Sequence, residues 1–146
     1  MKVGILTAAL RNAPLSEVFS FAKSIGAQTV ELNYAPYKES IKQLAKEKGL
    51  EISALGFYAN YLDPDEKKRA ANLGSAKAAI DFASANGIDL LCTFVGRDPW
   101  KDVNDNLKLL EEEFAPLVDY ADSKNIRVAF ENCPMEKFPS GTNLAF

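Results

Sequence analysis

The chain alternates between two hydrophobic patterns, one helical and one extended. Apolar residues three and four positions apart predict four helices, each closed by a residue that suits the turn after a helix. They are expected over residues 14–24, over 37–48, from 63–65 to Gly87, and along Leu107, Leu110, Phe114, Leu117, Val118 and Ala121 up to Asn125. In the third helix, Asp63 is the expected N-cap and Pro64 the residue that opens the first turn.

Short, continuous apolar runs fill the intervals between these helices. They predict strands over residues 2–6, 29–32, 51–55, 90–95 and 126–130. A helix between two strands provides the crossover that parallel pairing needs, so the order predicts an α/β fold with parallel strands.

Two α/β folds fit this order of elements. One is an open, doubly wound sheet of five strands, for which 146 residues is a natural length. The other is a (β/α)8 TIM barrel, which takes about 250 residues and would be only partly present, with about five strands and four helices. We treat residues 1–146 as a single domain. The segment after Glu131 has the composition of a loop that follows a barrel strand, so we expect an N-terminal portion of a barrel, truncated in the loop after strand 5.

Composition excludes several classes of function. The 146 residues are 47% hydrophobic and 25% charged, with a net charge of −3. No run of Lys and Arg offers the positive surface that nucleic acid requires, and no apolar run approaches the ~20 residues that span a bilayer. The sequence has no histidine, which removes histidine bases and histidine-based zinc sites from these residues. Cys92 and Cys133 lack CxxC spacing and are expected to be reduced, mostly buried thiols of a cytoplasmic protein.

In both folds the functional edge is the carboxyl end of the strands. Glu131 follows the apolar strand 126–130 directly, and Asn132 follows it. A carboxylate at that edge is well placed to ligate a hard divalent cation or to move a proton. Glu131 is therefore the candidate catalytic residue and metal ligand, with Asn132 as a candidate substrate contact.

Polar residues at other strand ends are further candidates for substrate binding. Glu31 lies within the second strand, where a carboxylate is costly unless it is paired or bound; an outward-facing or structurally hydrogen-bonded Glu31 is the alternative. Asn60 and Tyr61 follow the third strand in an aromatic segment that suits a small polar ligand with a sugar face, or that simply packs the loop.

The fourth strand ends in Thr93, and Arg97 follows it. Both are candidate substrate contacts. Arg97 would hold an anion, or would instead form a surface ion pair with its neighbour Asp98.

Three segments resemble the xylose isomerase-like TIM-barrel superfamily, and more narrowly its sugar phosphate isomerase/epimerase branch. They are Phe130-Glu131-Asn132-Cys133-Pro134-Met135, Cys92-Thr93-Phe94-Val95-Gly96-Arg97 and Leu62-Asp63-Pro64-Asp65. The resemblance covers nearly the whole chain, and the first segment is its most specific part.

The resemblance implies a site built around Glu131, which corresponds to the first of four metal ligands of the family. The other ligands, an Asp, a His and a second Glu, belong to strands six to eight. The implied cofactor is Mn²⁺ or Mg²⁺, with Zn²⁺ as a further candidate. The implied reaction is a proton transfer beside a sugar carbonyl through an enediolate. The family often has a histidine near the third or fourth strand end, where this sequence has Tyr61 and Thr93.

Two hypotheses of different classes follow. In the first, the chain is the N-terminal part of a divalent-metal-dependent sugar or sugar phosphate isomerase/epimerase and is inactive alone. In the second, it is a non-catalytic half-barrel that binds or assembles with another chain. A DNA-repair endonuclease of the same superfamily is disfavoured, because it needs several histidines and a basic groove. In an open half-barrel, we expect Val30, Ile52 and Phe130 to face the barrel interior and the bare sheet edges to favour self-association.

Overall fold

The sheet is built from five parallel strands in sequential order. The computed structural model describes residues 1–37 and 40–131. The strands are β1 (Gly4–Leu6), β2 (Thr29–Asn33), β3 (Glu51–Gly56), β4 (Leu90–Thr93) and β5 (Arg127–Phe130), paired in the order β1-β2-β3-β4-β5. A doubly wound sheet reverses its strand order at a switch point, whereas a barrel adds each strand beside the last. The fold is therefore a partial (β/α)8 barrel, and the open doubly wound alternative does not apply.

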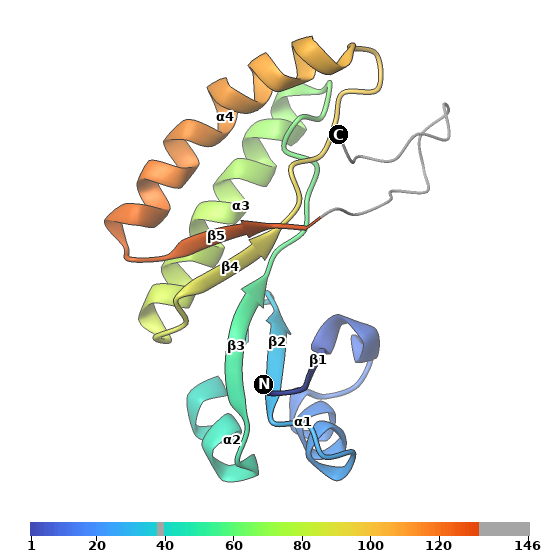
Figure 1. Ribbon diagram of the computed structural model, residues 1–146, viewed down its shortest axis with the longest axis vertical. Coiled ribbons are helices and arrows are strands. Elements are labelled where there is room, and N and C mark those ends of the chain that lie inside the picture. Colours follow the sequence, from blue (N-terminus) through green and yellow to red (C-terminus); the bar gives the residue numbers. More distant parts are fainter. Residues whose placement is uncertain (38–39, 132–146) are drawn as a thin grey trace.

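The helices lie outside this curved sheet. A short 3-10 turn, η1 (Thr7–Leu10), follows β1, and the α-helices are α1 (Leu15–Ser24), α2 (Ile41–Lys48), α3 (Glu66–Ala85) and α4 (Val103–Ser123). Figure 1 shows α3 and α4 side by side along β4 and β5. None of the helices within residues 1–37 and 40–131 combines the length and apolar character that a membrane crossing needs.

The hydrophobic core fills the space between the sheet and the helices. Val30 and Leu32 of β2 are both fully buried there, together with helix residues such as Phe19 and Ile80. Because side chains alternate along a strand, the residues between them face the other side of the sheet. That other side is the inner face of the partial barrel.

Three apolar residues predicted for the barrel interior instead face the helices. Val30 has no exposed surface, and Ile52 packs against the same core. Phe130 is 54% exposed, and its ring contacts Phe114 of α4 edge-on at 5.2 Å. The prediction was wrong because this face of the strands packs against the apolar side chains of the helices.

The predicted ends of the third helix and the inward face of the fourth need correction. Helix α3 starts at Glu66, because the Asp65 carboxylate accepts hydrogen bonds from the amides of Lys67 and Lys68 at 2.9 and 3.4 Å. Asp63, the expected cap, instead accepts a hydrogen bond from the amide of Asp65, two residues later.

In α4, Leu107 is 44% exposed, whereas Asn106 and Leu109 are buried. The Asn106 carboxamide donates to the carbonyls of Asp98 and Asp102 at 3.0 and 2.9 Å. These bonds set the orientation of the first turn of α4, so that the polar Asn106 points inward and Leu107 points outward.

Candidate functional site

The inner face of β2 carries Glu31, whose carboxylate is held by a tyrosine from the next strand end. The Tyr58 hydroxyl donates a hydrogen bond to Glu31 Oε1 at 2.5 Å. Gly56, at the end of β3, makes room for this pair. A Cβ at Gly56 would lie 2.8 Å from Glu31 Oε1 and 2.7 Å from Tyr58 Cε2, closer than packed atoms approach. Of the alternatives for Glu31, the structure shows a hydrogen-bonded carboxylate on the inner face.

The Tyr58 ring is fixed from a second side. It stacks on Phe94, which follows β4, with ring centroids 5.7 Å apart and planes at 26°. Burial raises the pKa of Tyr58 far above its usual value, and the hydrogen bond to Glu31 and the charges of Glu31 and Glu131 raise it further. Tyr58 therefore stays protonated at neutral pH and donates its hydrogen bond to Glu31.

Cys92 shares this environment from β4. Its neighbour Leu91 is fully buried in the core, so the alternation of the strand turns Cys92 toward the inner face. Burial raises the pKa of the Cys92 thiol to about 11, and the charges of Glu31 and Glu131 contribute. Cys92 is a free cysteine and only partly buried, and it is a neutral group of the inner face.

Glu131 stands at the carboxyl end of β5, where the sequence places the candidate ligand. Its backbone amide donates to the Thr93 carbonyl at 2.8 Å, which extends the pairing of β4 and β5 by one residue. Its side chain is exposed, yet its charge acts on both Tyr58 and Cys92. Residues from four neighbouring strand ends, Glu31, Tyr58, Cys92 and Glu131, thus form one cluster, which we call the inner-face cluster.

The described residues do not by themselves group into a metal site. Within residues 1–37 and 40–131, no three His, Cys, Asp or Glu side chains are grouped closely enough to hold a metal ion. Glu131 is chemically suited to a hard divalent ion, because it is an exposed carboxylate at the strand end. It fits as one ligand of a larger set.

Thr93 and Tyr61, two predicted substrate contacts, lie on the helix side of the sheet. Both side chains are fully buried. Thr93 Oγ1 lies 2.7 Å from the Phe57 carbonyl oxygen and 3.0 Å from the Tyr61 hydroxyl. The Tyr61 ring meets Phe114 edge-on at 5.0 Å, and burial raises the pKa of Tyr61 to about 12. The contacts of this pair join the β3–α3 loop to β4 and α4, and substrate binding by either residue stays a prediction.

Asn60 joins the loops that follow β3 and β4. Its Nδ2 donates to the Arg97 carbonyl at 3.0 Å, and its Oδ1 accepts from the amides of Arg97 at 2.9 Å and Leu62 at 3.1 Å. Gly96 allows this approach, since a Cβ there would lie 2.0 Å from Asn60 Oδ1 and its φ is +85°. Asn60 therefore fixes the backbone of Arg97, and a direct substrate contact by Asn60 stays a prediction.

Arg97 does not pair with Asp98. The Asp98 carboxylate is buried and binds the Trp100 amide at 3.0 Å and Lys101 Nζ at 3.8 Å. Arg97 is half-buried, and its Nε is buried without a hydrogen-bond partner in the part of the chain that the structure describes. The last predicted contact, Asn132, lies outside the described residues.

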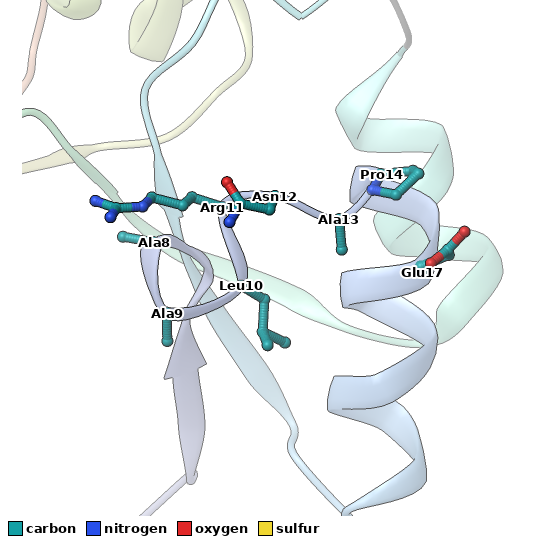
Figure 2. Close-up of a pocket in the computed structure, with 8 residues that line it drawn as sticks. All are labelled: Ala8, Ala9, Leu10, Arg11, Asn12, Ala13, Pro14 and Glu17. Atoms are coloured by element: carbon teal, nitrogen blue, oxygen red, sulfur yellow. The ribbon is translucent and has the colours of Figure 1, made fainter.

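Two hollows lie in the N-terminal part of the sheet, and one of them adjoins the cluster. One, of about 240 Å³, is lined by Gly4, Ile5, Leu6, Thr29, Glu31 and Ser53, so it reaches the inner-face cluster. The other, of about 620 Å³, lies beside η1 (Figure 2), with Arg11 and Glu17 at opposite ends of a lining that is otherwise mostly alanine, leucine and proline. Sequence reasoning gave Tyr58 and Cys92 no individual role. Their positions in the sequence could have indicated a role. Cys92 alternates with the apolar Leu91 along a strand, and Tyr58 comes two residues after Gly56, at the end of β3.

Comparison with known proteins places these residues in a family. Residues 19–144 match the family described as xylose isomerase-like TIM barrel. No curated protein matches the chain.

Solved structures share the fold at low sequence identity. The apo form of 3-keto-D-glucoside 4-epimerase, YcjR, from E. coli has a TM-score of 0.71 and 18% identity, over 92% of this chain and 57% of its own. D-psicose 3-epimerase, solved in the presence of D-fructose, has a TM-score of 0.70 and 16% identity, over 92% and 53%. The IolI protein with a bound zinc atom has a TM-score of 0.71 and 18% identity, over 89% and 51%. The chain thus spans little more than half the length of each of these three structures.

Proposed function

Because the chain belongs to the xylose isomerase-like TIM-barrel family, we propose that it is the N-terminal part of an enzyme that isomerises or epimerises sugars or sugar phosphates. The observation that carries this proposal is the position of Glu131, at the carboxyl end of β5 and in electrostatic contact with Tyr58 and Cys92. The fold likeness to two sugar epimerases supports it. We further propose a cytoplasmic location, where Cys92 would stay reduced.

A divalent cation is part of this proposal, with Mn²⁺, Mg²⁺ and Zn²⁺ as the candidates. Glu131 would be one of its ligands, and the zinc in the IolI structure supports metal use within this fold. When bound, such an ion polarises the carbonyl of a substrate and stabilises negative charge beside it. The remaining ligands would come from outside the described residues, which offer no group of three.

The chain's own residues would handle protons and sugar hydroxyls. Glu131 would take a proton from the carbon next to the carbonyl, or return it, as the substrate passes through an enediolate. Glu31 has one oxygen held by Tyr58, and its second oxygen is available to accept a bond from a sugar hydroxyl. Tyr58 keeps its proton and fixes the Glu31 carboxylate for that contact. Asn132, next to Glu131 in the sequence, would be a further substrate contact.

One observation favours the second candidate function, a non-catalytic assembly module. In the described sheet, β1 and β5 each pair with a single neighbour, and Phe130 of β5 is 54% exposed. Such an edge can pair with another chain. Sedimentation velocity would separate the two states of the chain, because assembly through β5 predicts a dimer whose population rises with concentration.

Manganese binding to the chain tests the main proposal. We expect Mn²⁺ to broaden the backbone amide signals of Glu131 and Cys92 before those of the acidic run at Glu111, Glu112 and Glu113 on α4. Glu131→Gln keeps the shape of the side chain but removes the charge that a hard ion requires, so it should abolish the local broadening. Glu111→Gln, an exposed control, should leave it intact. Broadening that centres on α4 in the unchanged chain would overturn the assignment of Glu131.

A further inference from the structure

Arg97 carries a buried donor that nothing in the described chain satisfies. Its Nε is buried and has no hydrogen-bond partner. Within residues 1–37 and 40–131, ion pairs form at Arg69 and Arg127, and Arg97 forms none. A buried N–H of a charged group costs free energy unless an acceptor meets it, so the site is complete only when an acceptor arrives from elsewhere.

The backbone of Arg97 is held from both sides. The Asn60 side chain accepts a hydrogen bond from the Arg97 amide at 2.9 Å and donates one to its carbonyl at 3.0 Å. Gly96 leaves the space for Asn60 to come this close, because it has no Cβ. Asp98, the nearest carboxylate in sequence, is engaged by Trp100 and Lys101 instead. These bonds fix the backbone from which the Arg97 side chain starts, and no acceptor among the described residues meets its Nε.

Arg97 also lies at the substrate edge of the sheet. It follows β4 by four residues, and the last residue of β4, Thr93, accepts the amide of Glu131 at 2.8 Å. Ligands of parallel barrels bind at this carboxyl edge. A planar guanidinium with several donors matches the paired oxygens of a phosphate or a carboxylate.

We propose that Arg97 binds the anionic group of the substrate, a phosphate or a carboxylate. This inference rests on the proposed isomerase or epimerase function and narrows its substrate class to sugar phosphates or sugar acids. The ligand oxygen completes the hydrogen bond that Nε lacks. A neutral sugar offers no charge to this guanidinium and binds more weakly.

Arg11 is the matched control at the same edge. It lies in the β1–α1 loop and lines the hollow of about 620 Å³ (Figure 2). Arg11 is exposed, so water satisfies the N–H donors of its guanidinium. If anions were attracted to this edge by charge alone, they would bind near both arginines. The proposed site predicts binding at Arg97 and not at Arg11.

The test follows the arginine Nε–H signals of the ¹⁵N-labelled chain, without added metal. Three ligands are titrated separately: D-fructose 6-phosphate, D-glucuronate and D-fructose. We expect the Arg97 signal to shift with at least one of the two anions and not with D-fructose, and the tighter anion identifies the substrate class. Arg97→Gln should weaken that anion by about tenfold to a hundredfold, the loss of one charge-assisted contact, while Arg11→Gln leaves it unchanged. Equal shifts at Arg11 and Arg97, or none with either anion, would overturn the proposal.

The outcome is separable from the test of the main function. The titration uses no metal and leaves Glu131 untouched, and the unchanged chain alone decides it even where Arg97→Gln fails to fold. An Arg97 response in a chain that fails the manganese test would leave an anion site without the proposed chemistry. A manganese response without an Arg97 response would leave the proposed chemistry with a neutral substrate.

Discussion

The Tyr58 hydroxyl donates to Glu31 Oε1 at 2.5 Å across the space that Gly56 leaves open between β2 and β3. This bond joins two residues that are 27 positions apart in the sequence. It places a fixed carboxylate on the inner face of the barrel, beside Cys92 and Glu131.

Removing the Tyr58 hydroxyl should destabilise the fold modestly. Tyr58→Phe leaves the ring on Phe94 but deprives Glu31 of its donor. We expect a loss of about 1 kcal/mol in the free energy of unfolding, at the low end for a bond to a charged group because the pair is only half-buried. Urea unfolding at neutral pH measures it. Tyr34→Phe is the control, since the Tyr34 ring packs against Phe57 and Phe82 and its hydroxyl has no hydrogen-bond partner among the described residues.

The same bond predicts a pH dependence. The pKa of Tyr58 is raised in the folded state from 10.0, so its contribution to stability is complete below about pH 10 and is lost as the pH rises further. We expect the unchanged protein to lose more stability above pH 10 than Tyr58→Phe does. Equal losses in both proteins would show that Tyr58 titrates normally.

Cys92 reports the charges of the inner-face cluster. In a Cys133→Ser background, we expect alkylation of Cys92 to follow a pKa of about 11, well above that of an unperturbed thiol. Glu31→Gln should move the profile to lower pH, because one of the two carboxylates that raise the pKa becomes neutral. Glu51→Gln, which changes an exposed carboxylate paired with Lys2, should not move it. An unmoved profile in Glu31→Gln would separate Cys92 from the cluster.

Gly56 and Gly74 should respond to alanine in opposite directions. A Cβ at Gly56 meets Glu31 and Tyr58 within 2.8 Å, so Gly56→Ala forces the pair apart. We expect it to lower the free energy of unfolding by about 1–3 kcal/mol. At Gly74, in α3, a Cβ meets nothing within 4 Å, and Gly74→Ala should stabilise by about 0.5–1 kcal/mol. Thermal unfolding of both variants checks the pair, and a neutral Gly56→Ala would mean that the space is not needed.

The local hydrophobic pattern of the sequence predicted most of the fold but few of the contacts in the candidate site. The strand–helix order and the apolar runs predicted five parallel strands, because each needs only nearby residues. The face of each strand was harder. Val30 and Glu31 differ by one position, and only the packed helices decide which of them turns inward.

The missed features depend on contacts between distant segments. The rotation of α4 follows from Asn106 bonding to Asp98 and Asp102, which no periodicity reveals. The alternative of a surface ion pair between Arg97 and Asp98 was wrong, because Asp98 is buried and binds Lys101 and the Trp100 amide. Tyr58 reaches Glu31 only because Gly56 is small. The position of Glu131 was predictable, since it depends only on where one strand ends; its role as a ligand stays a prediction.

The most direct test of the central claim is Glu131→Gln in a complete barrel that carries this chain as its N-terminal part. Mn²⁺ affinity and turnover of ketose or ketose phosphate should fall together, by at least about tenfold, because a hard ion loses an anionic ligand. The unfolding midpoint without metal should hold or rise, since Glu131 is exposed and outside the packed core. Val128→Asp, which places a charge against that core, should unfold the protein with or without metal. Full turnover in Glu131→Gln would contradict the account.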